Sequence, residues 1–232
     1  SVPISSEEKP KVSGEFQEKW QELVDLAARI IGVPAGLIMR LLEKEIEVFT
    51  SSRTHNNPYE QKEKADLGYG LYCETVVGKR QELMVPYAPD DEKWKNNPDV
   101  RLNMVSYYGV PIRWPDGEVF GTFCVLDDKE NQYSEDQKAL VTKFAELVER
   151  DLNVLYEREE TLNTLAYKET QLREMSHRIK NQFNMLISYI DLHKLDEEDF
   201  SSTLADDMQN RIMVLSRLHD TLANSDMDSS IN

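Results

Sequence analysis

The N-terminal part of the chain switches from a helical to a strand-like pattern of apolar residues. Over residues 16–31, apolar side chains recur at spacings of three and four, which predicts an amphipathic helix that ends at Gly32. The apolar run 35–42 and the alternating run 46–50 then predict two strands. Only a few polar residues separate these runs, so we expect a tight hairpin between them.

Short elements alternate with polar stretches in the middle of the chain. We expect a loop over 53–66, a short helix over 71–77, a strand over 83–87, a charged loop over 90–97 and one or two helical turns over 99–104. Trp94 is the one aromatic residue of the charged loop, and we expect its side chain to be exposed.

The clearest hairpin follows, between residues 107 and 126. Two strand-like runs, 107–113 and 119–126, flank the tetrapeptide Trp-Pro-Asp-Gly. An early proline and a late glycine favour a tight turn at this point. Ser134 then opens a helix, and Gln137 three residues later completes a capping-box pattern.

One very long helix is predicted after this cap. From residue 134 to about residue 192 the chain contains no proline and no glycine. A heptad count begun at Val141 finds apolar residues at eleven of sixteen a and d positions, which is typical of a coiled coil. Asp151, Arg158 and Glu169 interrupt the seam, so the stretch is either a switchable element or a poorly packed linker.

A second helix completes the C-terminal pattern. Residues 195–202 form an acidic connector, and apolar residues on one face of 204–222 predict another helix. A helical hairpin with so wide an apolar face cannot bury it alone, so we expect two copies to form a four-helix bundle. Residues 1–14 and 223–232 lack periodicity, which predicts a disordered lead-in and a polar tail.

Charge and composition exclude several classes of function. The 232 residues include 43 acidic and 27 basic ones, for a net charge of −16. So acidic a chain is a poor binder of nucleic acid or of an anionic membrane surface. No run of 18 apolar residues could span a membrane, and the chain does not open with a secretory signal. With only two cysteines, a reducing cytoplasm is the expected location.

Few residues stand out as carriers of chemistry. Cys73 and Cys124 lie 51 residues apart in different elements with no histidine nearby, so we expect no metal site. His177 differs from the other histidines, since Arg178 and Lys180 flank it and Asn181 follows one helical turn later. A neutral imidazole is a competent nucleophile, and phosphoryl transfer to it needs access, alignment and charge compensation. The same residues also fit a solvated surface histidine without a chemical role.

Two segments of the predicted hairpin resemble sensor histidine kinases of the HRxKN subgroup. They are Ser-His-Arg-Ile-Lys-Asn-Gln-Phe at 176–183 with Leu-Ile-Ser at 186–188, and Arg-Ile at 211–212 with Leu-His-Asp-Thr-Leu at 218–222. The resemblance implies that His177 is the phosphoacceptor and that Asn181 handles the attacking group. Arg178 and Lys180 match the basic pair of the motif. The Gln-Phe pair of the first segment departs from the Asn-Leu that is frequent in the family.

Residues 15–155 resemble a GAF domain, which implies an α+β fold with an antiparallel sheet flanked by helices. The resemblance rests on Gly-Leu-Tyr-Cys at 70–73, Asn-Pro-Asp-Val at 97–100, Tyr-Tyr-Gly-Val-Pro-Ile at 107–112, Asp-Gly at 116–117 and Gly-Thr-Phe-Cys-Val-Leu-Asp at 121–127. Both cysteines fall at positions where such domains often carry one. A role as small buried residues is therefore the favoured one for both.

The GAF resemblance also implies a pocket for a small molecule whose identity stays open. The pocket would lie between the sheet and the connections of residues 53–104. Its candidate wall residues are Tyr69, Tyr72, Cys73, Tyr87, Trp94, Tyr107 and Tyr108, although core or surface packing also accounts for each of them. The chain has no Cys-His pair of the bilin-attaching kind, and His55 in its polar loop either ligates haem or stays solvated.

Together the resemblances imply a cytoplasmic sensor histidine kinase, with a GAF domain at 15–133, a signalling helix at 134–173 and a dimerisation and phosphotransfer hairpin at 174–222. A signal at the GAF domain would control phosphorylation of His177 and transfer to an aspartate of a response regulator. ATP would come from a kinase domain that these residues lack, so we expect a truncated chain that is inactive alone. The alternative is a non-enzymatic dimeric adaptor for ligand binding or phosphotransfer.

Overall fold

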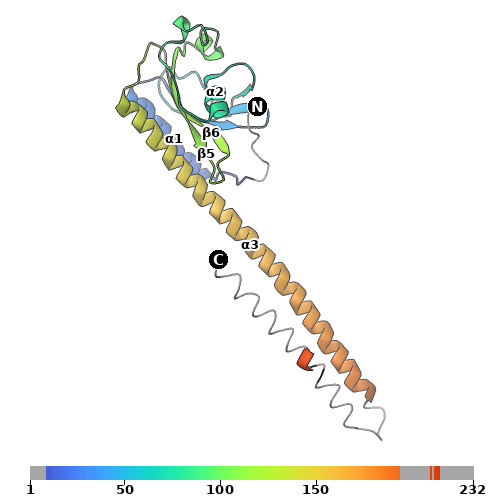
Figure 1. The fold of residues 1–232 in the computed structure, drawn as a ribbon. Coiled ribbons are helices and arrows are strands. Elements are labelled where there is room, and N and C mark those ends of the chain that lie inside the picture. The colour runs from blue at the N-terminus through green and yellow to red at the C-terminus, as the bar shows by residue number, and fades with distance from the viewer. Residues whose placement is uncertain (1–8, 194–209, 211, 215–232) are drawn as a thin grey trace. The chain divides into compact units, whose positions relative to one another are not determined.

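The computed structural model describes residues 9–193, 210 and 212–214 (Figure 1). The chain divides into two compact units, Ser1–Asn163 and Thr164–Asn232. The long helix α3, Glu135–His193, contributes residues to both units. The first unit holds the sheet and the other two helices, and the second holds the segment around His177.

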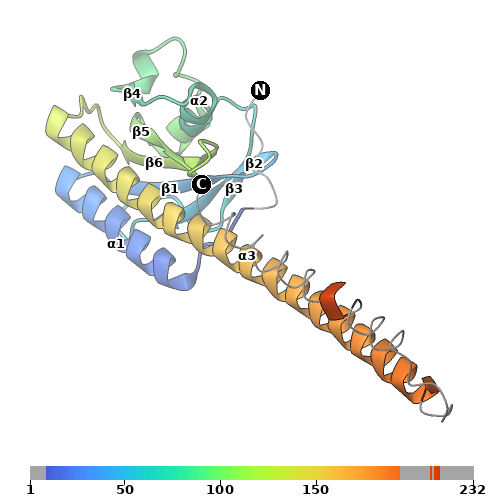
Figure 2. The same cartoon turned by 60° about the horizontal axis from the view of Figure 1, so that its bottom comes forward.

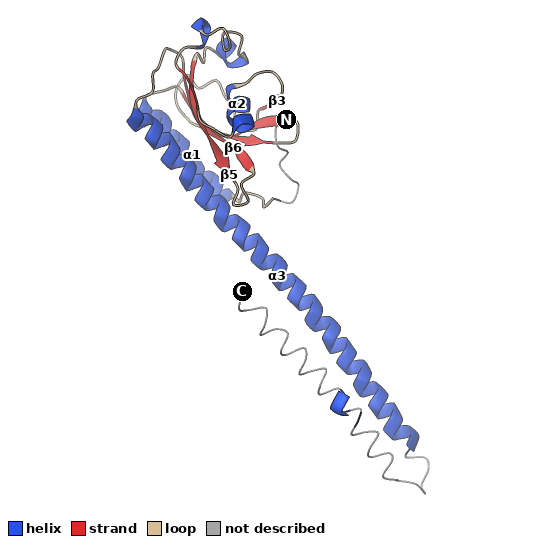
Figure 3. Cartoon of the chain, viewed as in Figure 1, coloured by secondary structure: helices blue, strands red, loops and turns tan. Residues whose placement is uncertain are grey.

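A six-stranded antiparallel sheet forms the centre of the first unit (Figure 3). Its strands are β1 Ala35–Leu41, β2 Glu45–Ser51, β3 Lys64–Asp66, β4 Leu83–Val85, β5 Ser106–Arg113 and β6 Val119–Asp127. They lie in the order β3-β2-β1-β6-β5-β4. The first and last strands in the sequence, β1 and β6, are therefore neighbours in the middle of the sheet.

Helices cover both faces of this sheet (Figure 2). Helix α1, Gly14–Ile31, and the first part of α3 lie side by side on one face. Helix α2, Tyr72–Lys79, covers the other face, with short 3₁₀ turns at Ala88–Asp90 and Pro98–Leu102 nearby. Each face of the sheet consequently has a hydrophobic core of its own.

The core under α1 and α3 is rich in aromatic rings. The Trp20 ring lies 5.6 Å from Phe49 and 5.7 Å from Phe120 between centroids. The indole Nε1 of Trp20 donates a hydrogen bond of 2.9 Å to Asp151 on α3, and Lys19 Nζ lies 2.6 Å from the same carboxylate. Asp151 is only 6% exposed, so these two partners offset the cost of burying its charge.

The predicted ends and turns of several elements are confirmed. Helix α1 ends where Gly32 adopts a left-handed φ of 79°, which costs glycine little. The turn between β5 and β6 closes through a hydrogen bond of 2.9 Å from the Gly117 amide to the Trp114 carbonyl. Ser134 and Gln137 form the predicted capping box, in which each side chain accepts a hydrogen bond from the other residue's amide.

Two predictions for the middle of the chain are wrong. Trp94 is buried rather than exposed, because its ring packs against that of Tyr72 with 5.2 Å between the centroids. Lys93 Nζ lies 4.2 Å from the centroid of the same indole ring. The predicted loop over 53–66 ends in β3, whose three residues pair with β2. A strand of three residues is too short to show an alternating pattern in the sequence.

The heptad pattern of α3 begins within the first unit and not in a coiled coil. Val141, Val148 and Leu155 are buried against α1 and the sheet. Asp151, which we expected to weaken a seam between helices, instead accepts the hydrogen bond of Trp20. The apolar face of this part of α3 is therefore covered by its own domain.

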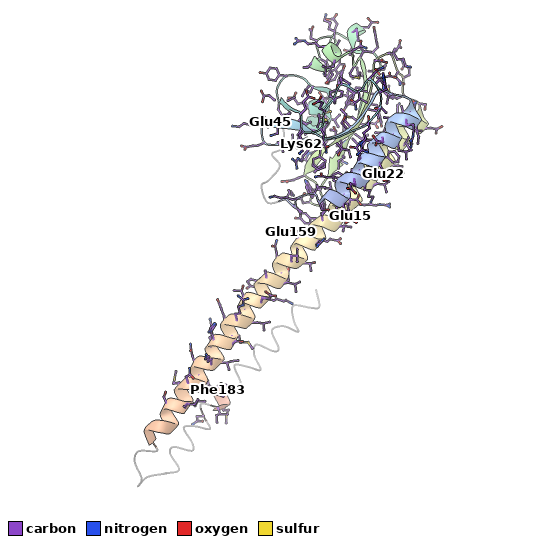
Figure 4. The ribbon with its side chains drawn as sticks, turned by 180° about the vertical axis from the view of Figure 1, so that it is seen from behind. Glu15, Glu22, Glu45, Lys62, Glu159 and Phe183 are labelled. Atoms are coloured by element: carbon purple, nitrogen blue, oxygen red, sulfur yellow. The ribbon has the colours of Figure 1, made fainter. Side chains whose placement is uncertain are left out.

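In the second unit several apolar side chains of α3 are exposed, while Met175, Ile179 and Leu186 are half-buried. Leu165, Leu172, Phe183 and Ile187 each expose between 53 and 61% of their surface. Figure 4 shows the Phe183 ring standing out from the helix. The coiled coil predicted for this stretch stays a prediction.

Parts of the predicted C-terminal hairpin lie outside the described residues. These are the connector 195–202, most of the helix predicted over 204–222 with His219, and the tail 223–232, while residues 210 and 212–214 are helical. Residues 1–8 of the predicted lead-in also lie outside. Within the described part of the chain, no helix combines the length and the apolar character needed to cross a membrane.

Candidate functional site: a cavity in the first unit and a histidine on α3

A cavity of about 150 Å³ lies on the α2 face of the sheet. Most of its walls are apolar side chains, among them Leu37, Met39, Ile46, Val48, Leu71, Leu102 and Leu126. The polar residues of the wall all come from the segment 53–104, which the sequence predicts as one side of a pocket. They are Tyr59, Glu63, Lys64, Cys73 and Asp99. An apolar chamber with a few converging polar groups is typical of a small-molecule site.

Asp99 and Tyr59 supply one polar group of this cavity. The Tyr59 hydroxyl donates a hydrogen bond of 2.8 Å to the Asp99 carboxylate. Burial, partly opposed by this hydrogen bond, raises the pKa of Asp99 from 3.8 to about 6. Burial also raises the pKa of Tyr59, so the phenol keeps its proton and remains a donor. The carboxyl of Asp99 can therefore gain or lose charge just below neutral pH.

A short turn holds Asp99 in place. The Asn97 side-chain oxygen accepts a hydrogen bond of 2.9 Å from the Asp99 amide. The Asn97 side-chain nitrogen donates one of 2.8 Å to the carbonyl of Gly70. Because Asn97 is buried, its two hydrogen bonds tie the turn before Asp99 to the segment that leads into α2.

The structure brings one of the predicted wall residues, Cys73, directly to the cavity. Tyr72, Trp94 and Tyr107 are buried in the core beside it and pack on one another, with ring centroids 4.9 Å apart for the two tyrosines. Tyr108 lies in the core of the opposite face, under α1 and α3. This separation follows from β5, since successive residues of a strand face opposite sides of the sheet.

Sequence reasoning missed Tyr59 and Asp99. The available signal was the Asn-Pro-Asp turn at 97–99, but it does not reveal where the carboxyl points. No sequence pattern indicated a role for Tyr59, because it lies in a polar loop 40 residues from its partner Asp99. Of the remaining predicted wall residues, Tyr69 is 70% exposed and Tyr87 is half-buried, and the cavity wall contains neither.

Cys73 and Cys124 meet beside this cavity although 51 residues separate them. Their sulfur atoms lie 3.8 Å apart, and both side chains are buried. The Tyr107 hydroxyl lies 3.5 Å from the Cys73 sulfur. The contact arises because Cys124 in β6 faces α2, which begins one residue before Cys73. Within the part of the chain that the structure describes, no cluster of three or more metal-ligating side chains is found.

His55 lies at a different place in the first unit. It lines an open depression of about 540 Å³ formed by the end of α1, the loop after β2 and residues 127–129. The side chain is exposed and does not line the Asp99 cavity. Any ligand of His55 would therefore bind at the surface, separately from a molecule in the cavity.

The predicted phosphoacceptor segment is helical and accessible in the second unit. His177, Arg178, Lys180 and Asn181 all belong to α3, and their side chains are exposed. Residues four apart lie on the same face of a helix, so the Asn181 amide follows the His177 imidazole one turn later. A reacting group that approaches from solvent can therefore meet the imidazole and the amide together.

Two family models match the chain. The model described as GAF domain matches residues 15–152, and the model described as histidine kinase matches residues 174–232. The first range contains the sheet, α2 and most of α1 and of the buried part of α3, and the second contains His177. None of the curated proteins matches the chain.

Solved structures share the fold of the first unit at low sequence identity. The blue-light absorbing form of the PixJ GAF domain from Thermosynechococcus elongatus is 14% identical, with a TM-score of 0.56 over 66% of this chain and 94% of that one. Free methionine-R-sulfoxide reductase from Neisseria meningitidis, in complex with its substrate, is 12% identical, with a TM-score of 0.51 over 62% and 80%. The chromophore-binding domain of bacteriophytochrome RpBphP3 from R. palustris is 12% identical, with a TM-score of 0.50 over 61% and 57%.

Because the sequence identities are this low, the structural matches are evidence for the fold alone. They agree with the antiparallel sheet and its flanking helices. The family model for the same fold spans more than half of the chain. The histidine kinase match begins at residue 174, within α3. The chain therefore belongs to the GAF domain family, and it joins that domain to a histidine kinase segment.

Proposed function

We propose that this chain is the sensory and phosphoacceptor portion of a sensor histidine kinase. A small-molecule signal binds in the Asp99 cavity, His177 accepts a phosphoryl group from ATP, and an aspartate of a response regulator then receives that group. One observation carries the proposal. His177 is exposed on α3 within the segment that matches the histidine kinase family, and Asn181 follows it one turn later.

The residues around His177 suit phosphoryl transfer. An imidazole nitrogen attacks the γ-phosphorus of ATP, the bond to the bridging oxygen breaks, and ADP leaves. Catalysis of such a step depends mainly on positioning and on compensation of negative charge. Arg178 and Lys180 supply positive charge close to the arriving phosphoryl group, in a chain whose net charge is −16. Asn181 offers a neutral amide that can hydrogen-bond the phosphoryl oxygens.

The Asp99 cavity is the proposed signal site. At about 150 Å³ it is smaller than many ligand pockets, which occupy about 300–1,000 Å³, so the ligand should be small. Its apolar walls favour a largely apolar molecule. The Asp99 carboxyl and Tyr59 hydroxyl favour one polar group on that molecule, placed to hydrogen-bond with them.

We also propose that two copies pair through the second unit. Leu165 and Leu172 are seven residues apart and exposed, which is the spacing of a coiled-coil seam and leaves both side chains accessible to a second copy. Phe183 extends the same exposed apolar series. Sedimentation at micromolar concentration should give the mass of a dimer, and Leu172→Lys should shift the population toward the monomer. A wild-type monomer under these conditions would contradict the pairing.

Transfer of radiolabelled phosphate tests the phosphoacceptor assignment. The chain is incubated with ATP and a separately purified ATP-binding domain from a histidine kinase of the same subgroup. We expect acid-labile label on the wild-type chain and none on His177→Gln. His55→Gln is the matched control, because it removes an exposed histidine of the first unit and should keep the label. Label that survives in His177→Gln would exclude His177 as the acceptor.

A further inference from the structure

The two thiols beside the cavity are close together but differ in access. Cys73 forms part of the cavity wall, whereas Cys124 is fully buried beneath it. Their sulfurs would have to approach from 3.8 Å to about 2.0 Å to form a bond. Cys73 lies in the first turn of α2, a helix of eight residues, while β6 is held by neighbouring strands on both sides. The shift therefore falls mainly on the start of α2.

Groups that can form hydrogen bonds lie close to the sulfur of Cys73. The nearest are the Cys124 thiol at 3.8 Å and the Tyr107 hydroxyl at 3.5 Å. Hydrogen bonding from Cys124, Thr122 and Tyr107 lowers the pKa of Cys73 despite its burial. Burial raises the pKa of Cys124 instead. Cys73, whose pKa is lowered, is also the cysteine that lines the cavity.

We propose that Cys73 and Cys124 are a redox couple that a hydroperoxide entering the cavity converts into a reversible disulfide. A thiol that lines a cavity, with a second thiol in contact with it, is the arrangement that this chemistry requires. The inference concerns the first unit alone and does not depend on the role proposed for His177.

The reaction has two steps. The Cys73 thiolate attacks one oxygen of hydrogen peroxide, the O–O bond breaks, and the leaving hydroxide takes up a proton to become water. Cys73 is then a sulfenic acid. The Cys124 sulfur attacks the Cys73 sulfur, the S–O bond breaks, and the leaving hydroxide takes the Cys124 proton. Two thiols and one peroxide thus give one disulfide and two waters, with sulfur oxidised and peroxide oxygen reduced.

The disulfide links the start of α2 to the centre of the sheet and moves one wall of the Asp99 cavity. Because Cys73 lines the cavity, oxidation should change which molecules fit there. A dithiol reductant restores both thiols and becomes a disulfide itself. Oxidation and ligand binding therefore act on the same chamber.

Mass spectrometry of the peroxide-treated chain tests the proposal. We expect the intact mass to fall by two hydrogen atoms, both cysteines to resist alkylation after denaturation, and one cross-linked peptide to contain Cys73 and Cys124. Dithiothreitol should reverse all three changes. In Cys124→Ser the reaction should stop at a sulfenic acid on Cys73, which dimedone traps. Cys73→Ser should give no dimedone adduct on Cys124 at the same peroxide dose.

Tyr107→Phe separates the proposed chemistry from simple proximity of the thiols. It removes only the hydroxyl beside Cys73, so sulfenic acid should form several-fold more slowly while the circular dichroism spectrum stays unchanged. Met84 on the edge strand β4 is exposed and reports the dose of oxidant. If both cysteines remain alkylatable when Met84 is oxidised, or if the disulfide joins two chains, the proposal is overturned.

Discussion

Two stretches of the same helix, α3, differ in what covers their apolar face. Val148 and Leu152 are fully buried against α1 and the sheet, whereas Leu165 and Leu172 are more than half exposed. The a and d positions of one heptad count run through both stretches, and Leu152 stands beside the d position of Asp151. The spacing therefore shows that a face of the helix needs a cover, and it does not reveal whether the cover comes from the same domain or from another helix.

The structural role of Asp151 is determined by the tertiary fold and not by its heptad position. As a charged residue at a d position it predicts a weak point between helices. In the structure its partner is the indole of Trp20, which lies 131 residues away in the sequence. Arg158 occupies the next d position and is exposed. Asp151 and Arg158 thus lie one heptad apart, but Asp151 makes a buried contact and Arg158 lies on a solvated surface.

The largest expected effect comes from shortening one leucine in each stretch. Leu152→Ala should lower the free energy of unfolding of the first unit by about 2–5 kcal/mol, because the side chain is fully buried. Leu165→Ala should change it by less than about 0.5 kcal/mol. Urea unfolding followed by tryptophan fluorescence measures both, since all three tryptophans lie in the first unit. Equal losses of unfolding free energy in the two variants would contradict the difference in burial between the two stretches.

A smaller effect is expected from the two polar seam residues. Asp151→Ala leaves the buried indole N–H of Trp20 without its acceptor and should cost about 1–3 kcal/mol. Asp151→Asn keeps an acceptor and should cost less. Arg158→Ala is the matched change in the exposed stretch, and the same unfolding measurement should show almost no effect. A large loss in Arg158→Ala would mean that the helix beyond residue 155 is also covered.

The smallest effect concerns the Asp99 cavity and should stay within the first unit. Since the pKa of Asp99 rises to about 6 on folding, the folded state holds a proton that the unfolded state loses between about pH 4 and 6. Stability should therefore fall as pH rises through this window. Asp99→Asn should abolish that fall and should raise the free energy of unfolding by about 1 kcal/mol at pH values above the window. This gain is smaller than the full pKa shift implies, because Asp99 is only half-buried.

A control variant fixes the sign of this pH effect. Tyr59→Phe removes the hydrogen bond that stabilises the Asp99 carboxylate, so the folded-state pKa rises further and the fall in stability should extend to higher pH. Urea unfolding at a series of pH values across the window measures all three proteins. A wild-type profile that rises through the window would contradict the assignment of the raised pKa to Asp99.

Local signals predicted much of the fold. The helix that ends at Gly32, the turn at 114–117 and the cap at Ser134 each depend on residues close together in the sequence, and each forms as expected. The segment around His177 is likewise helical as predicted, and a helix without proline or glycine determines which residues share a face. Family resemblance added the role that we expect for His177.

Contacts between distant residues could not be predicted in this way. The register of β6 and the placement of α2 bring Cys124 to Cys73, and the turn at 97–99 brings Asp99 to Tyr59. Trp94 lies in a charged loop, yet the loop folds back and packs its ring on Tyr72. In each case the partner is more than 20 residues away in the sequence, so neither residue spacing nor composition could reveal the contact.

The central claim is that His177, on the exposed stretch of α3, is the group that accepts phosphate. Tandem mass spectrometry at neutral pH, after phosphorylation by an ATP-binding domain added in trans, locates the modified residue directly. We expect a single phosphohistidine in the peptide that contains residues 174–180, located at His177. Phosphate on any other residue, with His177 unmodified, would contradict the claim.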